Sequence, residues 1–232
     1  MILQLTRMGF SLSRGDEALE RLRSDFDRQH FVRFPGFLRK DLLDVVCREV
    51  ERSDFYERTH AGIDDNKELC MRTQTTAGGL LHLLLNSEDL FDLISQITGC
   101  GPIGCFRGRV YRVVPRSGHR DAWHSDVARH RLVAMSINVS PAPYRGGTLQ
   151  MRAGGSTRVL RNIPNPGFGD AILFRIDRGL EHRITDIEGS SAKTAFAGWF
   201  HTKPSFRSLM PGRFKKIATK AKKESASTRP AR

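Results

Sequence analysis

Residues 169–201 read GDAILFRIDRGLEHRITDIEGSSAKTAFAGWFH, and this stretch decides the fold. It holds three short runs rich in apolar and β-branched residues, each separated from the next by glycine or by polar turn residues, which is typical of strands joined by turns. In the last run, KTAFAGWFH (193–201), side chains that alternate along a strand would place Lys193 and Trp199 on the same face.

The same pattern extends back through the C-terminal half of the chain. Further short runs of this kind are IGCFRGRVYRVV (103–114), RLVAMSINVS (131–140), GGTLQMR (146–152) and STRVLRN (156–162). Many short strands at short intervals indicate a β-sandwich or barrel. We therefore expect a mainly β core over residues 101–202.

The first hundred residues have a different character. The helical period of their apolar residues predicts helices over 14–30, 40–53 and 87–99, and alternation predicts a strand over 31–38. Residues 54–79 are polar and glycine-bearing without a clear period, so they are predicted to form a long loop that closes over a site as a lid. These elements are expected to support the β core in one domain over residues 1–212.

Composition and charge exclude several classes of protein. Of the 232 residues, 39% are hydrophobic and 27% charged, which excludes a disordered polyelectrolyte, and no apolar run is long enough to span a membrane. The first twenty residues lack the charged start and apolar stretch of a secretory signal, so we expect a cytoplasmic protein.

The positive charge is unevenly distributed. Of the net +13, residues 213–232 carry +7, because they contain eight basic residues and one acid, and residues 1–212 carry the other +6. The basic segment is predicted to be a disordered tail. The body contains only 3 Tyr and 2 Trp, too few for a base-stacking surface, so the charge does not argue for nucleic acid as the partner.

Three residues have the chemistry of a metal site. His124 and Asp126 are two positions apart, so in an extended segment both side chains point to one side, and His182 follows at the start of a later strand. Two imidazoles and one carboxylate form the site of non-haem Fe(II) oxygenases, which leaves coordination positions open for a co-substrate and O₂. A His-x-Asp pair also occurs by chance, and His119 with Asp121 forms a second one.

Lys193 is the second unusual feature. A basic side chain that projects from an apolar strand into a core is costly unless it is paired. A dicarboxylate co-substrate would pair it. The alternative is an ordinary surface lysine whose aliphatic stem lies along the sheet.

Taken together, these runs resemble the Fe(II)/2-oxoglutarate-dependent dioxygenases, on the prolyl 4-hydroxylase-like side. The resemblance covers roughly residues 30–202 and rests on the order HSD (124–126), GGTLQMR, GDAILFR, LEHRIT and GSSAKTAFAGWF (189–200). It implies a double-stranded β-helix, or jelly roll, with helices packed on one sheet.

The resemblance also implies roles for individual residues. His124, Asp126 and His182 would bind Fe(II), and Lys193 would pair with the distal carboxylate of 2-oxoglutarate. Arg183 is the alternative, because Lys193 follows the distal histidine one position later than in many relatives. Tyr111 would bond a co-substrate carboxylate.

The resemblance further bears on the choice of dyad and on the reaction. The family's next long strand begins shortly after its His-x-Asp pair, here near Arg131, which favours His124 and Asp126 over His119 and Asp121. Relatives that halogenate replace the carboxylate by a small residue, so Asp126 favours hydroxylation. No catalytic side chain is expected beyond the metal ligands.

Arginines surround the His-x-Asp segment and bear on the substrate. They are Arg107, Arg109, Arg112, Arg116, Arg120, Arg129 and Arg131. Some could favour an anionic substrate or an acidic carrier domain, whereas a solvated sheet face is the alternative. The expected function is hydroxylation of an unactivated C–H bond in a small molecule or carrier-tethered metabolite, with Fe(II), 2-oxoglutarate and O₂. The alternatives are the same chemistry on a protein or nucleic acid, and a non-enzymatic metal-binding jelly roll.

Overall fold

The structure is a computed structural model that describes residues 2–13, 16–59, 67–72, 76–119 and 121–203. Its largest element is an antiparallel sheet of seven strands. These are β3 (Phe31–Phe34), β4 (Phe55–Thr59), β5 (Lys67–Met71), β6 (Cys105–Val113), β7 (Arg131–Asn138), β11 (Ala171–Arg175) and β14 (Lys193–His201). Their spatial order is β3-β11-β7-β14-β6-β5-β4.

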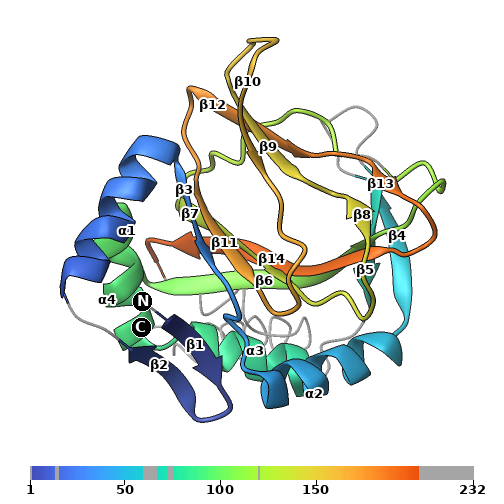
Figure 1. Ribbon diagram of the computed structural model, residues 1–232, viewed down its shortest axis with the longest axis horizontal. Coiled ribbons are helices and arrows are strands. Elements are labelled where there is room, and N and C mark those ends of the chain that lie inside the picture. Colours follow the sequence, from blue (N-terminus) through green and yellow to red (C-terminus); the bar gives the residue numbers. More distant parts are fainter. Residues whose placement is uncertain (1, 14–15, 60–66, 73–75, 120, 204–232) are drawn as a thin grey trace, which may run out of the picture. The chain divides into compact units, whose positions relative to one another are not determined.

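A smaller antiparallel sheet faces the large one. Its strands, in the order β10-β9-β12, are β9 (Leu149–Ala153), β10 (Val159–Ile163) and β12 (Leu180–Ile184). The two sheets pack through a cluster that joins Leu149 and Met151 of β9 to Ile172 and Phe174 of β11. Two facing antiparallel sheets (Figure 1) confirm the predicted mainly β, jelly-roll class.

Two short strand pairs complete the β structure. β8 (Arg145–Gly146) pairs with β13 (Ile187–Glu188). β1 (Ile2–Thr6) pairs with β2 (Gly9–Ser13) in an N-terminal hairpin that the sequence pattern did not predict.

Four helices cover the other face of the large sheet (Figure 1). They are α1 (Asp16–Gln29), α2 (Lys40–Glu51), α3 (Thr76–Leu85) and α4 (Glu88–Thr98). Three of them agree with the predicted helices to within two residues at each end. Their apolar faces bury the main core together with the sheet, in which the ring of Phe200 lies 4.9 Å from that of Phe106 and 6.2 Å from that of Phe91.

Alternation along the strands divides the large sheet into two faces. On β14, Phe196 and Phe200 are buried against the helices, whereas Lys193, Ala197 and Trp199 line a cavity between the sheets. The prediction that Lys193 and Trp199 share a face is therefore confirmed. The helices thus pack against one face of the large sheet, and the other face lines the cavity.

The prediction of a long loop over residues 54–79 is wrong. Its described residues form β4 and β5, which extend the large sheet beyond β6, and the first turn of α3. β4 is the edge strand of the sheet and β5 lies next to it, and both are half exposed, so they carry polar residues instead of an apolar alternation. In α3, Gly78 and Gly79 conceal the helical pattern, because glycine disfavours helix, and burial of Leu81 and Leu85 offsets that preference.

Two further predictions concern the ends and the membrane. The basic segment 213–232 lies outside the described residues. Within the part of the chain that the structure describes, every helix is too short or too polar to cross a membrane.

Candidate metal centre

The two histidines of the predicted triad lie side by side across a two-residue bridge. The backbone N–H of His182, on β12, donates to the carbonyl of His124 at 2.9 Å, and the N–H of His124 donates back to His182 at 3.1 Å. The ring of His182 lies 4.4 Å from that of His124. The smaller sheet therefore brings together two residues that are far apart in the sequence.

Asp126 faces both histidines. Its Oδ1 lies 3.8 Å from Nε2 of His124, and its Oδ2 lies 3.2 Å from Nε2 of His182. Ligand atoms of the three residues all lie within 4.8 Å of one another. Two imidazole nitrogens and a carboxylate oxygen converging in this way are a donor set that suits Fe(II).

Hydrogen bonds fix the orientation of His124. Its Nδ1 lies 2.8 Å from the carbonyl of Ala122, to which it donates, so that the Nε2 lone pair points toward the other two ligands. The carboxylate of Asp121 lies 3.5 Å from the same Nδ1 and accepts the N–H of Ile184 at 2.7 Å. Asp121 thus supports His124 from the side away from Asp126.

Asp126 remains ionised in this setting. Burial acts to raise the pKa of its carboxyl group, but the neighbouring His182, His124 and Trp199 Nε1–H outweigh it and lower that pKa to about 2. A permanently charged carboxylate beside two imidazoles is ready to bind a cation.

The alternative dyad is not assembled in the same way. His119 is buried, and its Nδ1 accepts the backbone N–H of Val114 at 3.1 Å. Among the described residues, the group that could hold a metal ion contains His124, Asp126 and His182 and leaves out His119.

The triad opens onto a cavity of about 300 Å³ between the two sheets. Apolar side chains form much of its wall, including Leu149, Ile172, Phe174 and Ile184. Tyr111 and Lys193, the predicted co-substrate-binding residues, also line it, together with Arg58, Lys67 and Glu68 from the β4–β5 hairpin. The predicted lid segment therefore contributes to the site as an edge of the sheet.

Lys193 is the most deeply buried cation in this wall. Only 3% of the residue is exposed, and its Nζ donates to the carbonyl of Gly147 at 2.6 Å and lies 5.8 Å from the ring centre of Tyr144. Among the described residues, no carboxylate oxygen comes within the 4.0 Å of an ion pair. Burial lowers the pKa of Lys193 to about 8, with Asp121 acting in the opposite direction. A dicarboxylate could supply the missing counter-charge.

Gly147 is a residue that the sequence pattern missed. Its φ of +61° favours glycine, and a Cβ there would lie 2.8 Å from Cδ of Lys193 and 2.6 Å from Cδ1 of Ile187. Because Gly147 has no side chain, its carbonyl can accept the hydrogen bond from the ammonium of Lys193. In the sequence, the Gly-Gly pair at 146–147 could have indicated this backbone conformation, because both residues have positive φ.

Tyr111 lies on β6, and Ser136 lines the same cavity. Burial raises the pKa of Tyr111 above the ordinary value, so the tyrosine keeps its proton and can donate to a carboxylate. Arg183, the alternative to Lys193, instead donates to Gln150 at 2.9 Å and lies over the ring of Trp123, outside the cavity lining.

The arginines around the dyad have separate roles. Arg109 pairs with Glu68 at 2.9 Å, and Arg112 donates to Thr194 and covers the ring of Phe55. Of the described arginines in this group, Arg109 and Arg131 line the cavity. Arg120 lies outside the described residues.

Comparison with known proteins identifies this arrangement. Residues 108–201, which contain all three candidate ligands, Tyr111 and Lys193, match the family model of the 2OG-Fe(II) oxygenase superfamily. Over this segment the chain is similar to that superfamily. It is therefore an enzyme whose cofactors are Fe(II) and 2-oxoglutarate, and the donor set of its triad fits that metal.

Solved structures share the fold of this oxygenase at low sequence identity. A prolyl-4-hydroxylase from Pseudomonas putida is 17% identical, with a TM-score of 0.58 over 80% of this chain and 99% of its own. A prolyl hydroxylase from Trichoplax adhaerens, in complex with a hypoxia inducible factor peptide fragment, is 18% identical, with a TM-score of 0.57 over 80% and 90%.

A third similar structure carries out a different reaction. The alpha-ketoglutarate-dependent epimerase SnoN from nogalamycin biosynthesis is 14% identical, with a TM-score of 0.61 over 84% of this chain and 90% of its own. No curated protein matches the sequence of this oxygenase. Because the similar folds include both hydroxylases and an epimerase, the substrate has to be argued from the site.

Proposed function

We propose that this oxygenase hydroxylates an unactivated C–H bond of an anionic small molecule or carrier-tethered metabolite. In this proposal His124, Asp126 and His182 hold Fe(II), and Lys193 and Tyr111 hold 2-oxoglutarate. The observation that carries it is the opening of the triad onto a cavity that also contains the buried ammonium of Lys193, which pairs with no carboxylate among the described residues.

The roles of the protein residues follow from their positions. Fe(II), 2-oxoglutarate and O₂ bound here would supply the oxidising power for C–H cleavage, with succinate and CO₂ as co-products. Lys193 offers a positive charge and Tyr111 a proton for carboxylate binding. The apolar wall of Leu149, Ile172 and Phe174 keeps water away from the reacting C–H bond.

The size of the cavity supports a small substrate. Its volume of about 300 Å³ is at the lower end of the range of roughly 300–1,000 Å³ found for small-molecule sites. A segment of polypeptide or a nucleotide strand would have to lie across the cavity mouth, with only one side chain or base inside it. A small molecule, or the end of a tethered one, fits without this constraint.

The charge of the cavity supports an anionic substrate. Of the described lining residues, five are basic (Arg58, Lys67, Arg109, Arg131 and Lys193) and three are acidic (Glu68, Asp121 and Asp126). Fe(II) and doubly ionised 2-oxoglutarate carry equal and opposite charges, so their binding leaves the positive excess unchanged. A positively charged cleft attracts anionic ligands.

The test is succinate release with different classes of candidate substrate. Purified full-length enzyme with Fe(II), 2-oxoglutarate and O₂ is incubated with carboxylated or phosphorylated small metabolites, with mixed peptides, or with single-stranded oligonucleotides. We expect stimulated succinate release with members of the first set, and none with the Asp126→Ala variant.

Two outcomes would count against the proposal in different ways. Stimulation by peptides or oligonucleotides alone would overturn the small-molecule substrate, and an oligonucleotide effect should weaken steeply with added salt. Failure to release any succinate, with substrate or without it, would contradict the oxygenase chemistry itself.

A further inference from the structure

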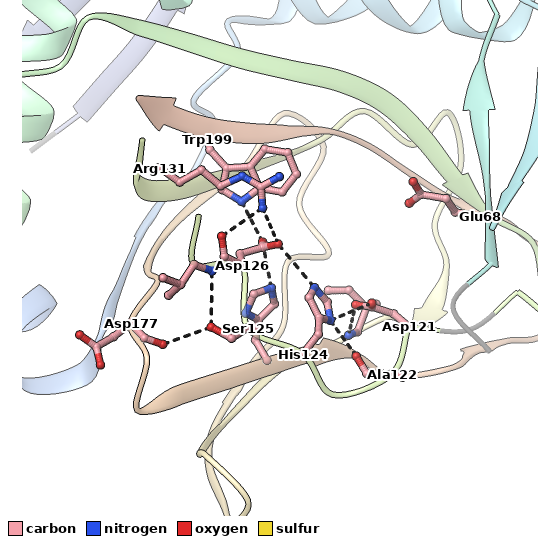
Figure 2. A network of polar contacts seen from close by, with 12 residues as sticks. Glu68, Asp121, Ala122, His124, Ser125, Asp126, Arg131, Asp177 and Trp199 are labelled. Carbon is pink, nitrogen blue, oxygen red and sulfur yellow. Dashed lines mark hydrogen bonds and ion pairs between the residues drawn. The ribbon is translucent and has the colours of Figure 1, made fainter. Parts of the chain in front are cut away.

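Both carboxylate oxygens of Asp126 accept a hydrogen bond from outside the metal-binding triad. The Nη1 of Arg131 donates to Oδ1 at 3.1 Å, and the indole Nε1–H of Trp199 donates to Oδ2 at 2.8 Å. Figure 2 shows Arg131 and Trp199 together on one side of Asp126, with His124 on the other. The carboxylate is therefore held between two donors and two imidazoles.

The two donors also hold each other. The guanidinium of Arg131 lies 3.6 Å from the ring centre of Trp199, in a cation–π contact. Arg131 begins β7 and Trp199 lies on β14, and these two strands are paired along their length. Each donor is thus fixed by the large sheet and by the other donor.

Asp126 needs such support more than the two histidines do. His124 and His182 are fixed by their mutual backbone hydrogen bonds, whereas Asp126 lies outside the strands, in the segment before β7. Arg131 reaches back to this segment twice, because the same Nη1 that binds the carboxylate also donates to the backbone carbonyl of Asp126 at 3.0 Å. This double contact attaches the segment to the sheet.

We infer that Arg131 and Trp199 are positioning residues that hold the carboxylate of Asp126 in its metal-binding orientation. A carboxylate bonded at both oxygens cannot rotate about its side-chain bonds without breaking a hydrogen bond. Groups that orient a ligand in this way typically contribute about 10–100-fold to metal affinity. The inference rests on the proposed function, in which Asp126 is a metal ligand.

The Trp199→Phe substitution tests one donor without changing charge. It removes the Nε1–H and keeps an aromatic ring beneath Arg131. We expect the Kd for Co(II), measured by titration against a competing chelator, to rise about 10–100-fold. The visible d–d absorption of bound Co(II) should also change, because the coordination geometry changes with the carboxylate.

The matched control is Trp123→Phe, at the other tryptophan of the chain. Trp123 stacks against Arg152 and Arg183 outside the cavity lining. This variant should bind Co(II) with the wild-type affinity and spectrum. A loss of Co(II) affinity common to both variants would be an effect of removing an indole, and not of removing the hydrogen bond to Asp126.

The Arg131→Lys substitution tests the other donor. It retains the positive charge, so the electrostatic repulsion between this side chain and the metal is unchanged. A lysine, however, cannot stack on the ring of Trp199 and also bridge the carboxylate and the backbone carbonyl of Asp126 as the planar guanidinium does. We expect a loss of Co(II) affinity of the same order, about 10-fold or more. Arg129→Lys, at an exposed arginine two positions away, is the control and should have no effect.

The outcomes separate this inference from the proposed function. If wild-type protein does not bind Co(II), the metal-site assignment fails. If wild-type protein binds Co(II), and Trp199→Phe and Arg131→Lys bind it equally well with the same spectrum, only the positioning role is overturned. Thermal unfolding of each variant checks its folding, and should Trp199→Phe not fold, the Arg131→Lys result decides alone.

Discussion

Substitution of His124 by alanine is expected to abolish both Fe(II) binding and 2-oxoglutarate turnover. The change removes one of the three ligand groups that converge within 4.8 Å. The effect should exceed the roughly 10–100-fold that is typical of residues supporting a ligand, because a ligand itself is lost. Equilibrium dialysis with Fe(II) and a succinate assay measure the two effects separately.

His119→Ala is the matched control for this prediction, because His119 begins the competing His-x-Asp pair. The substitution leaves the backbone N–H of Val114 without its acceptor, which should cost about 1–3 kcal/mol of stability. Metal binding should nevertheless persist. The reverse pattern, with binding lost in His119→Ala and retained in His124→Ala, would transfer the metal site to the other dyad.

Lys193→Ala should weaken 2-oxoglutarate binding more than any other substitution outside the triad. The ammonium is 3% exposed and has no carboxylate partner among the described residues, so the co-substrate would supply its counter-charge. Truncation of one member of a buried charge pair costs about 2–5 kcal/mol. This corresponds to a rise of roughly 30- to 4,000-fold in the Kd for 2-oxoglutarate, with Fe(II) affinity unchanged.

The protonation of Lys193 gives this prediction a pH dependence. Burial lowers its pKa to about 8, and a bound carboxylate would raise that pKa again. Affinity for 2-oxoglutarate should therefore be constant below about pH 8 and decrease about tenfold per pH unit above it. Tyr111, whose pKa is raised by burial, stays protonated across this range.

The Lys193→Met variant separates loss of binding from loss of folding. Because the pKa of the lysine is lowered from 10.5 to about 8 in the fold, its protonated form destabilises the protein below about pH 8, and this cost disappears as pH rises from 8 to 10.5. Methionine should raise stability at neutral pH by up to about 3 kcal/mol. A variant that binds 2-oxoglutarate like the wild type would contradict the role of Lys193.

Local periodicity is enough to predict much of the site. Alternation along residues 193–201 placed Lys193 and Trp199 on one face, and the two-residue spacing placed His124 and Asp126 on one side of an extended segment. Strand and helix periods likewise located the β core and three of the four helices, because these elements bury one continuous apolar face.

The missed features depend on contacts between distant parts of the chain. The β4–β5 hairpin lies at a sheet edge, where few apolar residues are needed, so its strands resemble a loop in sequence. The hydrogen bond between Trp199 and Asp126 joins residues 73 positions apart, and the acceptor of Lys193 is the backbone carbonyl of Gly147. Neither a backbone acceptor nor a contact between distant segments leaves a periodic signal.

The central claim is that one cavity holds Fe(II) on His124, Asp126 and His182 with 2-oxoglutarate beside it. The most direct test is an anaerobic titration of the full-length protein with Fe(II) and 2-oxoglutarate, followed by visible absorption. We predict a weak charge-transfer band that requires both additions and is absent from the His182→Ala variant. Absence of the band in wild-type protein, or its persistence in His182→Ala, would contradict the claim.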